Sequence, residues 1–329
     1  MPLARLAPRP RHLLLALIIA TLGTATAPGQ AQSARLPSLG DASSDDLDVA
    51  QEKRLGEAIM RDLRKDPDYL EDAVLQAYLD GLLAPLLQAA RDRNDIDADL
   101  ARRYAWQGFL VRDRAVNAFA LPGGYIGVYL GLISLTATPD ELASVLAHEL
   151  THVTQRHIAR SMGNASRQSM AAMAGMLLGV LAAAKANSVD GMQAAVVGAQ
   201  AMAAQGQLNF SRDMEREADR IGLDLMGGAG YSARGMAGMF EKLDGASRLN
   251  DGGNYPYLRS HPLTSERITE ARLRAEGAPA QSPEHLVLHA LMQARARALA
   301  DPGEQALRRL QAAGALGSPA ADTARQAAL

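Results

Sequence analysis

One short segment, His148-Glu149-Leu150-Thr151-His152, has the residue types and the spacing of a catalytic metal site. It lies inside a helical pattern that runs from Thr138 to about Arg160. Residues four apart lie one above the other on a helix face, so the two imidazoles can hold one metal ion from the same side. The carboxylate of Glu149 then points beside the metal, where a base must lie to take a proton from metal-bound water. This pattern is typical of zinc peptidases.

The residues around this segment favour a buried, rigid helix. Thr138 can cap it, Pro139 fits the first helical position, and Glu141 completes a capping box. Apolar residues recur at helical spacing along one face, at Leu142, Val145, Leu146, Leu150 and Val153. The alternative is a pair of structural histidines that are partly buried and capped by neighbouring carbonyl groups.

A catalytic zinc site needs a third protein ligand. Glu215 and Asp219 are four apart in the run from Ser211 to Asp219, so a helix presents both on one face. Glu215 can bind the metal while Asp219 accepts the spare ring proton of a liganding histidine, which fixes the tautomer of that ring. Glu217 falls on nearly the opposite face, where we expect it to be solvated or paired with an arginine. Taken alone, these acidic residues would be charged surface; the histidine motif favours ligand roles for Glu215 and Asp219.

Composition and the first residues predict an exported protein. The 329 residues carry a formal net charge of −2, which gives no reason to expect a nucleic-acid partner, and they include no cysteine. Residues 1–31 combine early arginines, an apolar run from Leu13 to Leu22 and a small-residue cleavage site at Gly29-Gln30-Ala31, as a secretory signal peptide does. The alternative, a membrane anchor, needs about 20 apolar residues. We therefore expect a periplasmic protein without a membrane span in the mature chain.

The rest of the chain reads as helices around a few strands. We expect residues 32–45, which are rich in Ser, Pro, Gly and Asp, to be a flexible lead-in. The apolar spacing predicts helices at 46–65, 69–91, 211–228, 232–247 and 264–275, and a helical hairpin at 283–300 and 304–311. It predicts about three strands, at 104–111, 115–121 and 125–130, with a type II turn at Pro122-Gly123-Gly124.

Two segments have a functional and a structural interpretation. Asn117-Ala118-Phe119-Ala120 is either a strand edge that pairs with extended substrate or part of an ordinary buried hairpin. The Ala-, Gly- and Met-rich residues 162–207 are either a core hairpin or a functional segment, which would be a mobile lid, a surface for unfolded chains or a membrane face. His157 falls off the ligand face of a continuous helix, so we expect a structural role for it. His261, read alone, is an exposed loop histidine before a proline.

The histidine motif, Glu215-x-x-x-Asp219, Asn117-Ala118-Phe119-Ala120 and Pro122-Gly123-Gly124 together resemble metallopeptidase family forty-eight. The resemblance is to the group that contains HtpX, the CAAX-prenyl proteases and the exported BepA-like periplasmic proteases, and it covers about residues 46–275. It implies a zincin-like α+β fold, mostly helical, with a small sheet beside the active-site helix.

The resemblance also implies the site. One Zn²⁺ per subunit would be held by His148, His152 and Glu215, with Glu149 as the general base. His261 matches a histidine that can occupy the fourth zinc position and keep the enzyme latent. Arg267 matches an arginine near the site that can stabilise the developing oxyanion.

We expect a peptidase domain at residues 46–277 and a short, truncated tetratricopeptide-like appendage at 278–329. The resemblance implies an endopeptidase of misfolded or stalled envelope proteins, with unfolded outer-membrane proteins and the outer-membrane assembly machinery as partners, and peripheral membrane contact is compatible with it. The alternative is a chaperone or adaptor with little proteolytic turnover. A structural zinc site is disfavoured because such sites prefer cysteine and leave no idle glutamate beside a histidine.

Overall fold

The computed structural model describes residues 48–162, 212–249, 255–278, 283–304 and 308. The signal peptide, the lead-in and residues 163–207 of the predicted lid or core hairpin lie outside the described residues, as does most of the predicted helix at 304–311. The described residues form a mostly helical α+β fold with one small mixed sheet, which confirms the predicted class.

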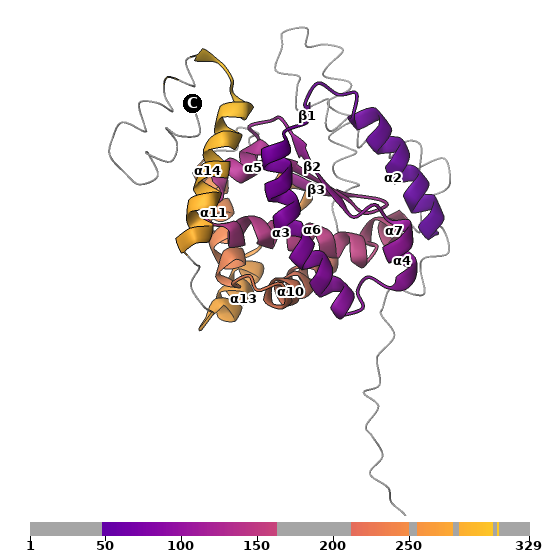
Figure 1. The fold of residues 1–329 in the computed structure, drawn as a ribbon. Coiled ribbons are helices and arrows are strands. Elements are labelled where there is room, and N and C mark those ends of the chain that lie inside the picture. Colours follow the sequence, from indigo (N-terminus) through magenta and orange to yellow (C-terminus); the bar gives the residue numbers. More distant parts are fainter. Residues whose placement is uncertain (1–47, 163–211, 250–254, 279–282, 305–307, 309–329) are drawn as a thin grey trace, which may run out of the picture. The chain divides into compact units, whose positions relative to one another are not determined.

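The described residues form helices and strands in the following order (Figure 1). They are α2 Val49–Leu63, β1 Tyr69–Leu70, α3 Ala73–Asp92, α4 Ala98–Arg103, β2 Gln107–Val111, β3 Ala118–Leu121, β4 Tyr125–Tyr129, α5 Leu130–Leu135, α6 Pro139–Thr154, α7 His157–Met162, α10 Arg212–Gly228, α11 Arg234–Leu249, α12 Tyr257–Ser260, α13 Ser265–Ala275 and α14 Pro283–Ala300.

The sheet formed by the described residues has four strands in the order β1-β2-β4-β3. Strands β2 and β4 are parallel, whereas β1 and β3 pair antiparallel with their neighbours. The hairpin turn between β3 and β4 has Gly123 at φ +79°, the left-handed value that the predicted type II turn requires at its third position. Strand β3 therefore forms one edge of the sheet.

Several short elements differ from the prediction. The predicted helix at 69–91 begins only at Ala73, because Asp72 caps it and Tyr69 pairs with Val111 in the sheet. The predicted strand at 104–111 begins at Gln107, after the short helix α4. Helix α5 follows β4 directly, within an apolar run whose periodicity does not separate strand from buried helix.

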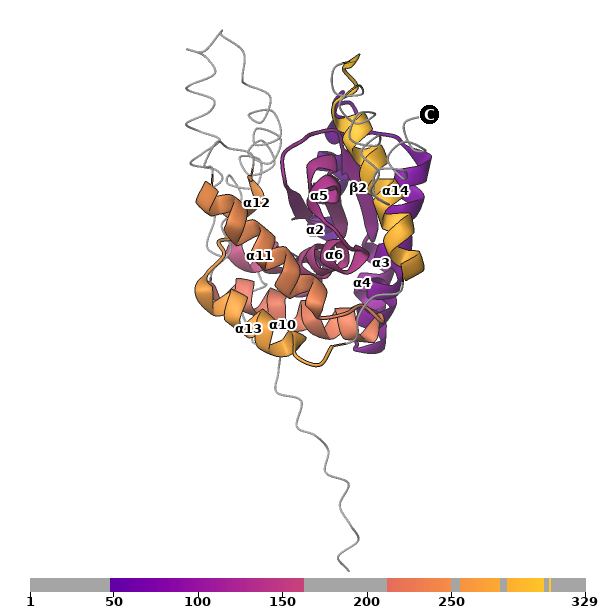
Figure 2. The same ribbon diagram turned by 90° about the vertical axis from the view of Figure 1, so that its left-hand side faces the viewer.

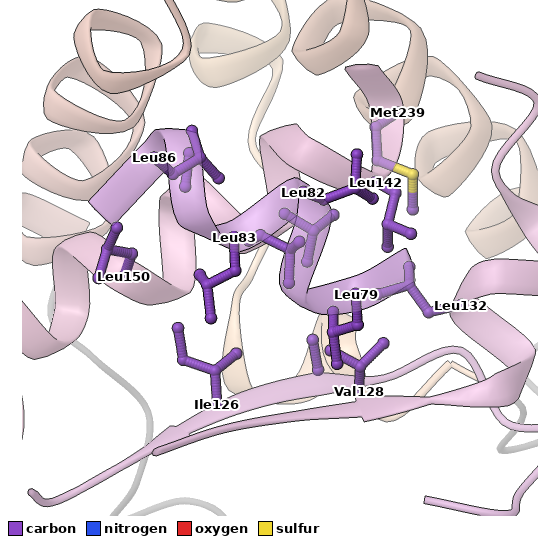
Figure 3. Close-up of a cluster of buried hydrophobic side chains, with 14 of the residues drawn as sticks. Leu79, Leu82, Leu83, Leu86, Ile126, Val128, Leu132, Leu142, Leu150 and Met239 are labelled. Carbon is purple, nitrogen blue, oxygen red and sulfur yellow. The ribbon is translucent and has the colours of Figure 1, made fainter. Parts of the chain in front are cut away.

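Helix α3 forms the centre of the hydrophobic core. Figure 3 shows Leu79 and Leu83 of this helix beside Ile126 and Val128 of β4, and all four side chains are buried. By length and composition alone α3 is apolar enough to cross a membrane, but the core helix of a folded domain passes the same test. Its packing against the sheet, α6 and α10 assigns it to the core.

The predicted continuous helix from Thr138 to Arg160 is interrupted. Thr138 caps α6 as expected, accepting from the Glu141 backbone N–H at 3.2 Å. The Glu141 carboxylate accepts from the backbone N–H of Ala137 at 2.6 Å, so the second bond of the predicted capping box goes to the residue before the cap instead of to Thr138. Helix α6 ends at Thr154, and α7 begins after a two-residue elbow, Gln155 and Arg156. Arg156 has a φ of 52°, in the left-handed region, so the two helices cannot be one.

Candidate metal centre

Helix α6 carries the histidine motif and is buried along its whole length. It contacts the sheet, mainly at β3, and helices α10 and α11 on its other side, which lie together with α13 in Figure 2. Two glycines allow this close packing. A Cβ on Gly235 would come 2.3 Å from the Asp140 carbonyl carbon, and one on Gly222 would come 3.3 Å from the backbone nitrogen of His148. Gly222 therefore brings α10, with its acidic residues, against the first histidine.

Four side chains from three regions converge beside α6: His148, His152, Glu215 and His261. One nitrogen or oxygen atom from each lies within 4.8 Å of all the others, and all four residues are buried. The Nε2 atom of His148 lies 3.0 Å from Nε2 of His152 and 3.5 Å from Oε2 of Glu215. Oε1 of Glu215 lies 3.5 Å from Nε2 of His152.

These residues fit a zinc ion. Tetrahedral bonds of about 2.0–2.1 Å place neighbouring ligand atoms ~3.3 Å apart, close to the separations in the cluster. The donor set of two imidazoles and a carboxylate is also the kind found in catalytic zinc sites. The carboxylate oxygens of Glu215 lie 3.5 Å from Nε2 of both His148 and His152, a separation that one shared metal ion can bridge. The structure therefore brings the predicted ligands from α6 and α10 together.

Glu149 is fully buried next to the ligands. Among the described residues, both of its carboxylate oxygens lack a hydrogen bond. The nearby His261 Nε2 is 3.4 Å from Oε1, beyond good hydrogen-bond length. A buried carboxylate without a hydrogen bond is costly, so such a residue requires an explanation. A water molecule activated at the metal is a suitable partner for it.

Asp219 lies behind His148 on the same face of α10 as Glu215. Its Oδ1 is 3.0 Å from Nδ1 of His148, so the ring can donate there while Nε2 faces the other ligands. The burial of Asp219 opposes ionisation, but the hydrogen bonds from His148 and Arg267 outweigh it and lower the pKa of this carboxyl. The carboxylate therefore stays charged and fixes the tautomer of the ring.

Arg267, on α13, is 4% exposed and holds both acidic residues of α10. Its Nε donates to Asp219 Oδ2 at 2.6 Å and its Nη2 to Oδ1 at 2.8 Å. Its Nη1 donates to the Pro262 carbonyl at 2.8 Å and lies 2.9 Å from Glu215 Oε2. The guanidinium also lies over the Phe240 ring. The predicted oxyanion contact stays a prediction, because the described contacts of Arg267 are to the protein itself.

His261 follows α12 and completes the cluster. Its Nδ1 lies 3.2 Å from Nε2 of His148 and 3.0 Å from Oε1 of Glu215, and its ring stacks on Tyr257 with centroids 4.6 Å apart. The side chain is 2% exposed, so the interpretation as an exposed loop histidine is wrong. Its Nδ1 lies among the other possible ligand atoms, and its role as a fourth, regulatory ligand stays a prediction.

A further histidine, His157, lies behind His152, a contact that the sequence pattern did not predict. The Nδ1 atoms of His152 and His157 are 2.7 Å apart, and Nε2 of His157 is 3.1 Å from Oε2 of Glu217. Arg160 donates to the same oxygen at 2.9 Å, so the expected pairing of Glu217 with an arginine is confirmed. The hydrogen bond from His157, together with Arg160, lowers the pKa of Glu217 to about 2. His157 thus does contact a predicted ligand, because the helix turns at the elbow.

Glu52, on the first described helix, stabilises the elbow. Nε of Arg156 donates to Oε2 of Glu52, on α2, at 2.8 Å, and the Tyr104 hydroxyl donates to the same oxygen. Glu52 is 2% exposed, and its burial raises the pKa of the carboxyl against the opposing effect of these partners. A buried carboxylate that accepts from two donors, one of them the partly buried Arg156, therefore fixes the elbow.

The edge strand predicted to pair with substrate is β3, which contacts α6. The Asn117 carbonyl accepts from the backbone N–H of Tyr129 at 3.1 Å, and the Val116 carbonyl from that of Tyr257 at 3.3 Å. These contacts fix the start of the strand next to the cluster. Pairing of β3 with an extended peptide stays a prediction.

Comparison with known proteins agrees with this geometry. Residues 86–275 match the family described as Peptidase family M48. The "Putative beta-barrel assembly-enhancing protease" of Vibrio cholerae is 38% identical over 300 residues, 88% of this chain and 57% of that protein. The beta-barrel assembly-enhancing protease of Escherichia coli is 33% identical over 266 residues, 80% of this chain and 52% of that protein.

A more distant relative is the mitochondrial metalloendopeptidase OMA1 of Saccharomyces cerevisiae, 30% identical over 201 residues, 59% of this chain and 54% of that protein. The chain spans about half the length of the relatives it matches. The family match covers more than half of this chain and includes α6, α10 and the end of α12, which carry the cluster. The chain therefore belongs to peptidase family M48, a family of metalloendopeptidases, with His148, His152 and Glu215 as its metal-binding group.

Proposed function

We propose that this chain is a zinc-dependent endopeptidase in which Glu149 is the general base. The observation that carries the proposal is the Glu149 carboxylate, buried without a hydrogen bond beside the ligand cluster. When bound by His148, His152 and Glu215, the zinc ion supplies Lewis-acid polarisation of the scissile carbonyl and lowers the pKa of water. Glu149 takes the proton of the attacking water and returns it to the leaving amine.

The surrounding residues prepare the site for this step. Asp219 accepts the Nδ1 proton of His148, so that Nε2 presents its lone pair to the metal. Arg267 neutralises part of the negative charge of Glu215 and Asp219 and holds both in place. The donor for the tetrahedral oxyanion is Arg267 or a backbone N–H, with the remaining N–H of the guanidinium as the side-chain candidate.

His261 is proposed to regulate access to the metal. Its Nδ1 lies among the ligand atoms, where a fourth donor would exclude water and substrate. His261→Ala should therefore raise proteolysis, measured as the initial rate of casein cleavage at equal zinc content. Unchanged or lower activity would assign His261 to substrate binding or to the fold.

The proposed substrates are misfolded or stalled proteins of the cell envelope, including outer-membrane proteins, in the periplasm. Two observations support this. The relatives from Vibrio cholerae and Escherichia coli are named for the assembly of beta-barrels. The first residues have the pattern of a secretory signal peptide. The outer-membrane assembly machinery is the proposed partner.

The test is Glu149→Gln in the full chain. This change keeps the shape of the side chain but removes the base, so we expect unchanged zinc content and a fall in casein cleavage of about 10²–10⁴-fold. Glu57→Gln, on the exposed face of α2, is the matched control and should cleave at the native rate. Native turnover by Glu149→Gln, with one zinc ion bound, would show that another residue is the base.

The second candidate function is that of a chaperone or adaptor. It is favoured by the closed arrangement of the cluster, where His261 takes the place of a fourth donor. The test uses the native chain and the His261→Ala variant, both loaded with zinc, and an unfolded outer-membrane protein as substrate. Suppressed aggregation without cleavage by either protein would favour this candidate over the protease.

A further inference from the structure

We propose that His157 is the positioning residue of the metal ligand His152, and that the elbow between α6 and α7 brings the His157 ring into contact with the His152 ring. The inference rests on the proposed metal site. It assigns a role to a histidine that lies outside the ligand set and beyond the histidine motif, on a separate helix.

The hydrogen-bond geometry defines which ring donates. The Nδ1 atoms of His152 and His157 are 2.7 Å apart, so one of them must carry the proton that lies between them. His152 presents Nε2 to His148 and Glu215 and must keep the lone pair there to bind a metal. Its proton is therefore on Nδ1, and His157 accepts with its own Nδ1.

The other face of His157 is fixed as well. With Nδ1 as the acceptor, the neutral ring carries its proton on Nε2, which donates to Oε2 of Glu217 at 3.1 Å. Arg160 holds that carboxylate at 2.9 Å. The ring of His157 is 0% exposed, whereas Glu217 is 32% exposed. A charged pair near the surface thus orients a buried neutral ring, which in turn orients the ligand.

The two ligand histidines are consequently supported in different ways. His148 donates to the carboxylate of Asp219, an anion. His152 donates to a neutral imidazole, with the carboxylate of Glu217 one ring further away. A carboxylate partner makes a ligand imidazole more basic. His152 is therefore the ligand whose orientation depends on a second ring rather than on a directly bonded charge.

Helix geometry explains why this arrangement needs the elbow. On a continuous α-helix, residues five apart point about 140° away from each other. His157 would then face away from His152, as the sequence pattern indicates. The left-handed conformation of Arg156, held by Glu52 at 2.8 Å, redirects the chain so that His157 returns to the ligand.

The experiment compares three substitutions at His157 in the full chain. The side-chain oxygen of asparagine takes the place of Nδ1, so His157→Asn keeps the acceptor for His152. The amide nitrogen of glutamine takes the place of Nε2, so His157→Gln keeps only the donor to Glu217. His157→Leu fills the space and keeps neither. Each variant is titrated with Zn²⁺ against a competing chromophoric chelator, and the cobalt-substituted forms are compared by visible absorption.

We expect His157→Leu and His157→Gln to lose about 10–100-fold in zinc affinity, the usual effect of removing such a partner, and His157→Asn to recover most of it. The cobalt absorption bands should shift in the first two variants only. Unfolding temperatures of the metal-free variants report any effect on the fold. A purely structural role of His157 would not make His157→Asn bind zinc more tightly than His157→Gln.

Three results would overturn the assignment. Equal zinc affinity in all variants and the native chain would show that His152 is oriented without His157. Equal losses in His157→Asn and His157→Gln would assign His157 to packing, and this comparison decides even where His157→Leu does not fold. A native chain that binds no zinc would refute both the proposed function and this inference. If the native chain binds zinc and either of the first two results is found, only the inference about His157 fails.

Discussion

Removal of the Arg267 guanidinium should be the most destabilising single change at the metal centre. Arg267→Met keeps the length of the side chain and removes its charge and its donors. Asp219 and Glu215 would then lose contacts of 2.6–2.9 Å in a region where the three side chains are between 3% and 9% exposed. Two buried carboxylates would remain without the guanidinium, and His148 is the side chain in contact with both of them.

The size of the loss follows from burial. Breaking a buried ion pair by removing one partner costs about 3–5 kcal/mol, because the other charge is left uncompensated. Arg272 provides the matched control on the same helix. It pairs with Glu241 at 2.8 Å, but these side chains are 58% and 51% exposed. Exposed pairs contribute about 0–1 kcal/mol, so Arg272→Met should have a small effect.

The assay is urea unfolding followed by circular dichroism, with a chelator present because bound metal would add its own stabilisation. A loss of ~4 kcal/mol divided by an m-value of about 2–3 kcal/mol/M shifts the midpoint by more than 1 M. The double variant Arg267→Met, Asp219→Asn should be less destabilised than the sum of the single changes, by about 1–3 kcal/mol. Similar losses for Arg267→Met and Arg272→Met would refute the argument from burial.

Three further predictions concern stability. Asp72→Asn keeps the cap of α3 but loses the charge that pairs with Arg295 at 2.7 Å. Arg295 lowers the pKa of Asp72, so the pair stabilises the fold above about pH 4, and this stabilisation is lost as the pH falls through the lowered native pKa. Asp72→Asn should therefore cost ~1 kcal/mol of unfolding free energy at pH 7, measured by urea unfolding, and nothing in acid. Arg156→Gly should be more stable than Arg156→Ala by ~1 kcal/mol because of its positive φ, with the reverse order at Arg54 inside α2; the same order at both positions would contradict a left-handed elbow. Zinc at about 1,000 times its dissociation constant should raise the unfolding free energy by ~4 kcal/mol, and a chelator should reverse this.

The metal ligands were predictable because their signals are local. His148 and His152 are one helical turn apart, and so are Glu215 and Asp219, so helix periodicity alone puts each pair on one face. The start of α6 is also set by neighbouring residues, through the cap at Thr138. The fourth cluster residue, His261, was found only through the family resemblance, because its own neighbourhood reads as an exposed loop.

The short elements were missed because pairing partners distant in the chain define them. Strand β1 has two residues, and it is a strand only because Tyr69 and Leu70 pair with the end of β2. Helix α5 continues an apolar run that begins in β4, and nothing in the pattern of polar and apolar residues marks where the strand ends and the helix begins. Tertiary packing, rather than local preference, decides both.

The elbow after α6 shows most clearly where sequence patterns fail, because its local residues argue against it. Gln155 and Arg156 include neither glycine nor proline, and a non-glycine residue in the left-handed region costs about 1–2 kcal/mol. The compensation comes from Glu52, 104 residues earlier, whose buried carboxylate would be unpaired without Arg156 and Tyr104. Removing Arg156 would leave the buried carboxylate of Glu52 with one donor fewer, a loss of about 1–3 kcal/mol that offsets the backbone strain. The elbow, and with it the contact between His152 and His157, is therefore a property of the assembled core, and a substitution at Glu52 should disturb the metal site although the described hydrogen bonds of the Glu52 carboxylate are to Arg156 and Tyr104 and to none of the ligands.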